Sequence, residues 1–247
     1  MRYKVIIAYD GYEYHGWQTQ HLHNSIQEVM ETALKVIHGK HIEIIASGRT
    51  DSKVHALGQV AHFDSELAIK PAGMVKALNS NLPDNIRIKK AEIVSDDFHA
   101  RFDCVSKRYD YYLTNDNDNP FLKRYMGSVR GDLAVDKMQQ AAQIFIGTHD
   151  FTSFTSSKVN ALKDKTRTIT KFEVKAIDSG WHFIMEGDGF LRYQCRNMVA
   201  TLIEVGKEKL TISDVEAMLQ AADKHACRYK AEPQGLYLVE VNYEEVK

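Results

Sequence analysis

The chain of 247 residues has little of what marks several large classes of protein. It has only three cysteines, Cys104, Cys195 and Cys227, an odd number without Cys-x-x-Cys spacing. This pattern predicts reduced thiols and gives no sign of a structural zinc site. No apolar run approaches the roughly 20 residues that a membrane-spanning helix needs. We therefore expect a protein without a membrane anchor and without disulfide bonds.

The chain also lacks an excess of charge of either sign. Its formal net charge is −1, which argues against a strongly basic nucleic-acid binder unless the basic residues gather on one face. Hydrophobic residues make up 44% and charged residues 26%, an ordinary globular composition for one or two domains. The first residues, MRYKVII, follow a strand-like pattern without the apolar region or cleavage site of a signal peptide. A cytoplasmic protein is expected.

Several short motifs of catalysis and cofactor binding are missing or incomplete. There is no P-loop and no Gly-x-Ser-x-Gly sequence. Gly187-Asp188-Gly189 lacks the third glycine of a dinucleotide fingerprint and predicts a turn before a helix. The pair His21-x-His23 has no third metal ligand nearby. The sequence thus predicts no metal and no cofactor.

The first half of the chain alternates between two hydrophobic periods. Period-two stretches predict strands, and a Ser25-x-x-Glu28 capping box begins a helix that ends at Gly39. A second, shorter helix begins at Pro71. The expected strands are 3–10, 41–48, 58–66 and 86–94. The predicted order is β-α-β-β-α-β.

The second half repeats this order. A strand over 108–115 is followed by a helix that Gly147 ends, a hairpin at Ser179-Gly180, a helix ending near Gly206, and a helix capped by a box beginning at Ser213. Strands are expected over 167–178, 181–188 and 235–243. The sequence predicts an α+β fold of two ferredoxin-like (split βαβ) halves, mostly antiparallel, with domains 1–104 and 105–247.

Two long stretches, 11–24 and 147–166, have no clear period. Loops of this length in a compact domain tend to be functional or disordered, and their aromatic residues argue against disorder.

Three groups of residues could carry chemistry. Asp51, in Gly-Arg-Thr-Asp between two strands, is either a turn residue or a catalytic carboxylate. Arg192 and Arg196 are four apart on a predicted helix, so they form either a solvated basic stripe or a buried partner for a carboxylate. Tyr109 belongs to a tyrosine-rich strand, where core packing and base stacking are both open.

Seven segments together resemble the tRNA pseudouridine synthase A family. They occur in the family's order and span nearly the whole chain. They are YDGYEYHGWQTQ (9–20), SGRTDSKVHALGQVAHFD (47–64), FHARFDCVSKRYDYYL (98–113), GTHDFTSF (147–154), KTRTI (165–169), GFLRYQCRNM (189–198) and GLYL (235–238). The resemblance implies two ferredoxin-like halves around an active-site cleft, a homodimer, and no cofactor.

The resemblance also implies a role for individual residues. Asp51 matches the family's catalytic aspartate, and Arg196 matches the arginine that pairs with it. Tyr109 matches the tyrosine that stacks on the target base. Arg49 matches the arginine that helps bring the base out of the helix, and Leu236 an apolar residue of the pocket. The implied reaction converts uridine to pseudouridine at positions 38, 39 and 40 of the tRNA anticodon arm.

The chain departs from the family beside two of these residues. Ser52-Lys53 replaces Ala-Gly after the aspartate, and Gln194-Cys195 replaces Met-Val before the arginine. If the family glycine is left-handed, Lys53 is strained there. If it is not, Lys53 adds a cation, for which we expect RNA phosphate as the partner. The other cations expected along the cleft are Arg101, Lys107, Arg108, Lys163, Lys165, Arg167, Arg192 and Lys207.

Two other functions remain open from the sequence. An RNA-binding module of split βαβ type would bind without chemistry, and Asp51 would then be dispensable. A carboxylate-dependent glycosidase would need a second carboxylate across the cleft, for which the sequence offers no clear candidate. Within the synthase interpretation, the sequence leaves open which of the three uridines is preferred and whether Asp51 acts first as nucleophile or as base.

Overall fold

The computed structural model describes residues 1–19, 23–156 and 164–244. His21, Lys163 and parts of the two long aperiodic stretches lie outside the described residues. The chain divides into two compact units, residues 1–105 with 237–247, and residues 106–236. The last strand thus groups with the N-terminal residues, because it pairs in parallel with a strand of that unit.

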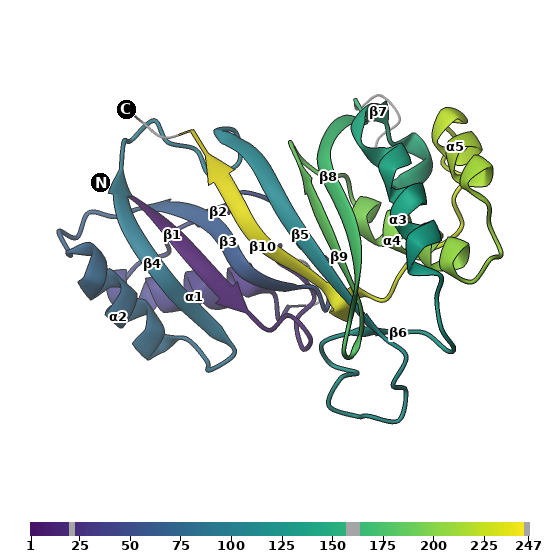
Figure 1. Ribbon diagram of the computed structural model, residues 1–247. Coiled ribbons are helices and arrows are strands. Elements are labelled where there is room, and N and C mark those ends of the chain that lie inside the picture. Colours follow the sequence, from purple (N-terminus) through teal and green to yellow (C-terminus); the bar gives the residue numbers. More distant parts are fainter. Residues whose placement is uncertain (20–22, 157–163, 245–247) are drawn as a thin grey trace. The chain divides into compact units, whose positions relative to one another are not determined.

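The first unit is a mostly antiparallel sheet covered by two helices. Its elements are β1 (Arg2–Tyr9), α1 (Ile26–His38), β2 (Ile45–Ala46), β3 (His55–Asp64), α2 (Pro71–Asn81), β4 (Ile86–Val94) and β10 (Leu236–Tyr243). The strand order is β4-β1-β3, with β2 paired to one part of β3 and β10 paired to another. The two helices lie on the same face of this sheet (Figure 1). The predicted β-α-β-β-α-β order is confirmed.

Local sequence accounts for these elements. Every second residue of β1 is buried, as its alternation predicts. The Ser25 hydroxyl accepts a hydrogen bond from the Glu28 amide at 3.2 Å, and Gly39 ends α1 in the left-handed conformation at φ 69°. The apolar stripes of the helices then close the core, which includes Met30, Leu34, Met74 and Leu78.

The strand predicted over 41–48 is wrong in its length, because β2 contains only two residues. Ile42 and Ile44 are buried, His41 and Glu43 are exposed and Ile45 is half-buried, so the alternation is real from residue 41 to residue 44. The Ile44 amide, however, donates to Glu31 Oε1 of α1 at 3.3 Å instead of to a neighbouring strand. The Glu31 side chain of α1 therefore takes the place of the backbone hydrogen bond to a neighbouring strand that the pattern predicts for Ile44.

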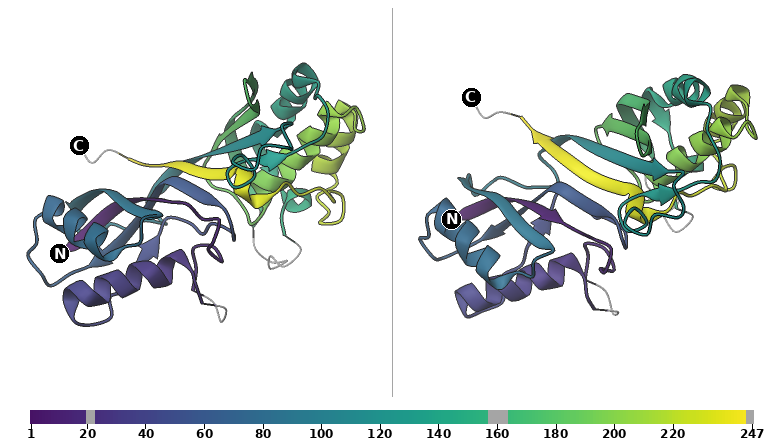
Figure 2. Two further views of the ribbon diagram at one scale, coloured as in Figure 1. Left: turned by 90° about the horizontal axis from the view of Figure 1, so that it is seen from below. Right: turned by 60° about the horizontal axis from the view of Figure 1, so that its bottom comes forward.

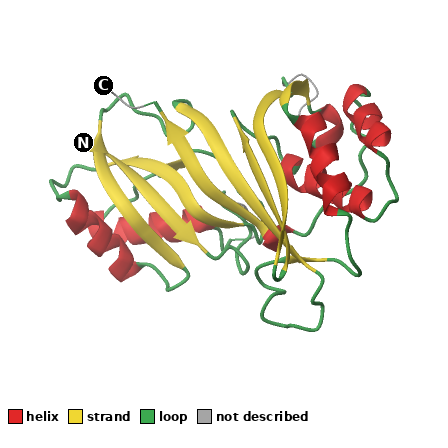
Figure 3. Cartoon of the chain, viewed as in Figure 1, coloured by secondary structure: helices red, strands yellow, loops and turns green. Residues whose placement is uncertain are grey.

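The second unit is also an antiparallel sheet with helices on one side (Figures 1 and 3). Its elements are β5 (Cys104–Thr114), β6 (Gly127–Ser128), α3 (Val135–Ala142), β7 (Gly147–Asp150), β8 (Thr166–Ile177), β9 (Gly180–Gly187), α4 (Gln194–Gly206) and α5 (Ile212–Gln220). The sheet order is β5-β9-β8-β7. Figure 2 shows the same two units from two further directions. The predicted α+β class with mostly antiparallel strands is confirmed.

Two details of this unit correct the sequence-based prediction. The capping box of α5 begins at Thr211 and not at Ser213: Asp214 N donates to Thr211 Oγ1 at 3.2 Å, and Thr211 N donates to Asp214 Oδ2 at 2.7 Å. The stretch 147–166 is not irregular throughout, because residues 147–150 form β7 and pair with β8. The hairpin at Ser179-Gly180 is confirmed.

Candidate active site

The predicted site residues divide between the two units. Four of them, Arg49, Asp51, Lys53 and Arg101, belong to the first unit, and the other four, Tyr109, Arg192, Arg196 and Leu236, belong to the second. The first three share one loop, and Arg192 and Arg196 lie close together at the start of α4.

The loop that carries Asp51 joins β2 to β3 and is tied down on both sides. At its start, Ser47 Oγ donates to Gln59 Oε1 at 2.8 Å, and Gln59 Nε2 donates to the Gly48 carbonyl at 2.9 Å. Next to the aspartate, Thr50 Oγ1 lies 2.8 Å from the Tyr9 hydroxyl. A half-buried carboxylate at position 51 is therefore held on a fixed backbone.

The segment 10–18 braces the same loop. Trp17 N donates to the Thr50 carbonyl at 3.1 Å, and the Tyr14 carbonyl accepts bonds from Ser52 Oγ and Lys53 N. A Cβ on Gly16 would lie 2.6 Å from the Thr50 carbonyl oxygen, too close for any side chain. Glycine at position 16 thus allows the two backbones to touch, and this part of the first aperiodic stretch has a defined structural purpose.

Lys53 has the left-handed backbone conformation, with φ 65°. Its ammonium group lies 5.0 Å from the centre of the Tyr12 ring. Of the two consequences expected from the family resemblance, the strained backbone is thus present, and the cation lies over an aromatic ring beside the Asp51 loop.

Arg196 is buried in the first turn of α4, with 8% of its surface exposed. Its Nε donates to the Ala231 carbonyl at 2.8 Å, and Ala231 N donates back to the Arg196 carbonyl at 3.1 Å. The solvated stripe considered for Arg192 and Arg196 is therefore wrong. The helix begins only at Gln194, so Arg192 lies outside it and is exposed while Arg196 is buried.

Tyr109 lies on β5, opposite Met185 of β9, and is 8% exposed. Its ring meets the Phe190 ring edge to face, with centroids 5.2 Å apart. Tyr111, two residues further along β5, is a core residue. Its hydroxyl donates to the Glu232 carbonyl at 3.0 Å, and its burial raises its pKa well above the ordinary value. Leu236, 5% exposed, begins β10.

The two departures from the family pattern have different surroundings. Ser52 Oγ and Lys53 N both donate hydrogen bonds to the Tyr14 carbonyl. Gln194, in contrast, is fully buried, and its Oε1 accepts a bond from Leu191 N at 2.8 Å. Its Nε2 has no partner among the described residues. The first replacement thus lies in the Asp51 loop itself, and the second lies in the buried first turn of α4, which also carries Arg196.

Sequence reasoning missed Tyr193 and Lys230. Tyr193 has φ 68° and its ring lies within 5.4 Å of three cations, one of them Lys230. A tyrosine between two arginines near the start of a helix is only a weak indication of a functional residue. No sequence pattern predicts that Lys230 lies next to Tyr193.

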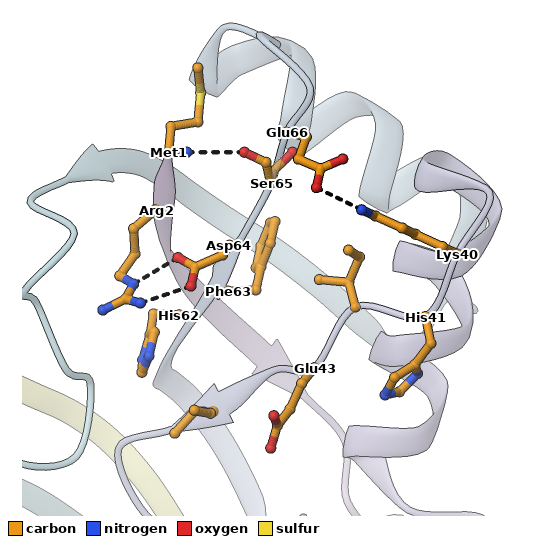
Figure 4. Close-up of a pocket in the computed structure, with 12 residues that line it drawn as sticks. Met1, Arg2, Lys40, His41, Glu43, His62, Phe63, Asp64, Ser65 and Glu66 are labelled. Atoms are coloured by element: carbon orange, nitrogen blue, oxygen red, sulfur yellow. Dashed lines mark hydrogen bonds and ion pairs between the residues drawn. The ribbon is translucent and has the colours of Figure 1, made fainter.

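A separate pocket of about 460 Å³ lies in the first unit and is lined by none of the predicted residues (Figure 4). Two ion pairs lie in its lining: Arg2 binds Asp64 through two bonds of 2.8 Å, and Lys40 pairs with Glu66 at 2.8 Å. His62, on its wall, is neutral, since burial and then the Arg2 charge lower its pKa to about 4. We assign no reaction to this pocket.

No group of three His, Cys, Asp or Glu side chains within 1–19, 23–156 and 164–244 could hold a metal ion. His23, at the edge of this range, pairs with Glu28 at 2.9 Å. Across the same ranges, no helix is long and apolar enough to span a bilayer.

Comparison with known proteins gives a consistent result. A family model described as tRNA pseudouridine synthase matches residues 5–103 and 141–244. Proteins named tRNA pseudouridine synthase A are similar over the full length: one from Exiguobacterium sp. is 46% identical over 99% of both chains, and one from Oceanobacillus iheyensis is 42% identical over 99% of this chain and 97% of its own. One from Staphylococcus aureus is 41% identical over 99% and 93%.

A solved structure is more distant. The crystal structure of a Cbf5-Nop10-Gar1 complex contains a chain with 15% identity and a TM-score of 0.42, matched over 97% of this chain and 50% of its own.

Proposed function

This chain belongs to the tRNA pseudouridine synthase family, and from this premise we propose that it isomerises uridine to pseudouridine at positions 38, 39 and 40 of the anticodon arm, with Asp51 as the catalytic carboxylate. The observation that carries the proposal is the Asp51 loop. It presents the aspartate of the Gly-Arg-Thr-Asp motif on a backbone fixed by Tyr9, Tyr14 and Trp17.

The reaction needs no electron carrier. The N1–C1′ glycosidic bond breaks, the uracil ring turns, and a C5–C1′ bond forms, while C5 loses a proton and N1 gains one. Substrate and product are isomers, so atoms and electrons balance without a cofactor. One ionised carboxylate can serve, as a nucleophile at C1′ or as a base, provided that a cation keeps it ionised.

Arg196 is our candidate for that cation. The Nε bond to the Ala231 carbonyl holds this buried guanidinium in place, and a guanidinium beside a carboxylate lowers the pKa of the acid. We propose that Arg196 pairs with Asp51 in catalysis, with Tyr109 as the ring on which the extruded uracil stacks and Leu236 as its apolar neighbour.

The remaining predicted residues would hold the RNA. Arg49 would help to extrude the base, and Lys53, Arg101 and Arg192, all exposed, would contact phosphates. An enzyme that modifies three neighbouring positions reads shape and backbone more than base identity, so contacts of this kind suit it. We further propose a homodimer in the cytoplasm, where tRNA is available and the three cysteines stay reduced.

The test is chemical mapping and mass spectrometry of tRNA treated with the pure protein. We expect pseudouridine at positions 38 to 40 and none in a matched tRNA carrying cytidine at these three positions. Tight tRNA binding without any pseudouridine would instead support the binding-module interpretation and overturn the proposal.

A further inference from the structure

Three cations surround the ring of Tyr193 at the start of α4. The Arg192 guanidinium carbon lies 4.8 Å from the ring centre, the Lys230 ammonium 4.7 Å, and the Arg196 guanidinium carbon 5.4 Å. Arg192 Nη2 also donates to the Tyr193 hydroxyl at 3.0 Å. One neutral ring therefore gathers three positive charges.

The backbone of Tyr193 is strained to make this arrangement. At φ 68° and ψ −1° it has the left-handed conformation, which costs a residue with a Cβ about 1–2 kcal/mol. Its side chain makes no capping bond to α4, so capping does not explain the choice of residue. Such strain persists where the surroundings enforce it, and it is found preferentially at functional sites.

Separate segments fix the cluster. The reciprocal bonds between Arg196 and Ala231 tie the first turn of α4 to residues 229–232, which brings Lys230 against the ring. On the other side, Ser156 N and Thr155 Oγ1 both donate to the Arg192 carbonyl, at 3.0 and 3.1 Å. These bonds fix the backbone of the two segments from which the three cations extend.

Part of this positive charge is open to solvent. Lys230 and Arg192 are exposed, and Lys230 has no carboxylate partner in the part of the chain that the structure describes. A tyrosine ring attracts each cation by only about 0.5–1 kcal/mol at an exposed site and neutralises none of them. A planar guanidinium beside an ammonium suits a phosphate. The phosphate oxygens can accept two parallel hydrogen bonds from the guanidinium, and their negative charge attracts the ammonium group.

We propose that Arg192 and Lys230, positioned by the Tyr193 ring, form a binding site for one phosphodiester of the substrate RNA. This inference rests on the proposed function, and it adds Lys230 and Tyr193 to the residues that the family resemblance implies. Because Arg196 shares the same ring, the phosphate bound here is one next to the target nucleotide. Tyr193 is a positioning residue, and the two exposed cations bind the phosphate.

The experiment measures tRNA affinity against KCl concentration for Lys230→Gln, Arg192→Gln and the double variant. Each single variant should bind about 5–10-fold more weakly at 100 mM salt, and the slope of log K against log salt should fall by about 0.7–0.9 for each cation removed. Lys230→Arg should restore most of the affinity. Lys224→Gln, which removes an exposed lysine six residues away, should change neither quantity.

Two substitutions of Tyr193 separate positioning from folding. Tyr193→Phe keeps the ring and should keep the salt slope of the wild type. Tyr193→Gly removes the ring but suits φ 68°, so it should lower affinity and salt slope without lowering the melting temperature. If Tyr193 were merely structural, the glycine variant would bind RNA as the wild type does.

The outcomes distinguish this inference from the proposed function. If the wild type makes pseudouridine but the Lys230 and Arg192 variants keep its affinity and salt slope, the phosphate site is overturned and the function stands. If these variants lose affinity but the wild type makes no pseudouridine, the phosphate site is supported and the proposed reaction is overturned.

Discussion

At the scale of single residues, Lys53 combines a backbone cost with a charge. Lys53→Gly should raise the free energy of unfolding by about 0.5–1 kcal/mol. Relief of the left-handed strain is worth about 1–2 kcal/mol, partly offset by the freedom of glycine in the unfolded chain. The same variant should bind tRNA more weakly, with a salt slope lower by about one unit or less. Urea unfolding and salt-dependent binding measure the two effects.

Lys53→Arg is the matched control, because it keeps the charge and the strain. It should resemble the wild type in both measurements. If the glycine variant instead changed the saturated single-turnover rate while binding and salt slope stayed the same, Lys53 would act on the Asp51 loop and not on phosphate.

His62 should make folding sensitive to acid. Its pKa is about 4 in the folded chain, chiefly because it is buried, against an ordinary value of 6.5, and its Nδ1 accepts a bond from Ala100 N at 3.1 Å. Between these values the unfolded chain binds a proton that the folded chain does not. The stability that the neutral ring contributes is thus complete above pH 6.5 and is lost as the pH falls toward 4.

His62→Asn should remove about 2 kcal/mol of this pH dependence, because the asparagine oxygen can accept the Ala100 bond and does not titrate. Urea unfolding at pH 7, 5.5 and 4.5 would show it as a smaller loss of stability than in the wild type. His41→Asn, at an exposed histidine, is the control. An unchanged loss in the His62 variant would contradict the assignment.

At the scale of helices and strands, the capping box of α5 gives a paired test. Thr211→Ala should destabilise the chain by about 1 kcal/mol, since it removes the acceptor for Asp214 N. Ser213→Ala, inside the helix and exposed, should change stability by a few tenths of a kcal/mol at most. Thermal unfolding of the two variants compares them directly, and equal losses would refute the assigned cap.

The sequence predicts most elements of this fold because period and caps are local properties. β1, α1, β4 and the hairpin of β8 and β9 follow from alternation, Ser25, Gly39 and Gly180. Two predictions failed for different reasons. β2 is short because Glu31 binds Ile44 N, and Thr211 and Ser213 both begin a box-like spacing that only the real helix start distinguishes.

The candidate site divides in the same way. Asp51 was identifiable because a specific motif surrounds it. The interpretation of Arg192 and Arg196 as one helix face failed because Tyr193 takes a left-handed conformation, which sequence does not encode for a tyrosine. Lys230 could not be predicted from the sequence, because it is 34 residues from Arg196 and lies beside α4 only through the backbone bond from Ala231 N to the Arg196 carbonyl.

At the scale of the whole molecule, a net charge of −1 is compatible with RNA binding only if the cations are grouped. Some of the cations expected along the cleft serve other purposes: Arg108 pairs with Asp110 at 2.8 Å, and Lys207 pairs with Glu204 at 2.7 Å. Under the proposed function, the RNA contacts come from the remaining cations, among which we place Lys53, Arg192 and Lys230.

The quaternary state is a further prediction at this scale. We expect light scattering at micromolar concentration to give twice the mass of one chain, because the family resemblance implies a homodimer whose subunits both contact one tRNA. A single-chain mass together with full activity at the same concentration would contradict it.

The most direct test of the central claim is the single-turnover rate of Asp51→Asn with saturating tRNA, read as pseudouridine formed. Asparagine keeps the size of the side chain but can neither attack C1′ nor accept a proton as a carboxylate does. We predict a fall of at least about a thousandfold, with tRNA affinity within a few-fold of wild type, and wild-type behaviour for the exposed Asp97→Asn. Substantial turnover by Asp51→Asn would contradict the account.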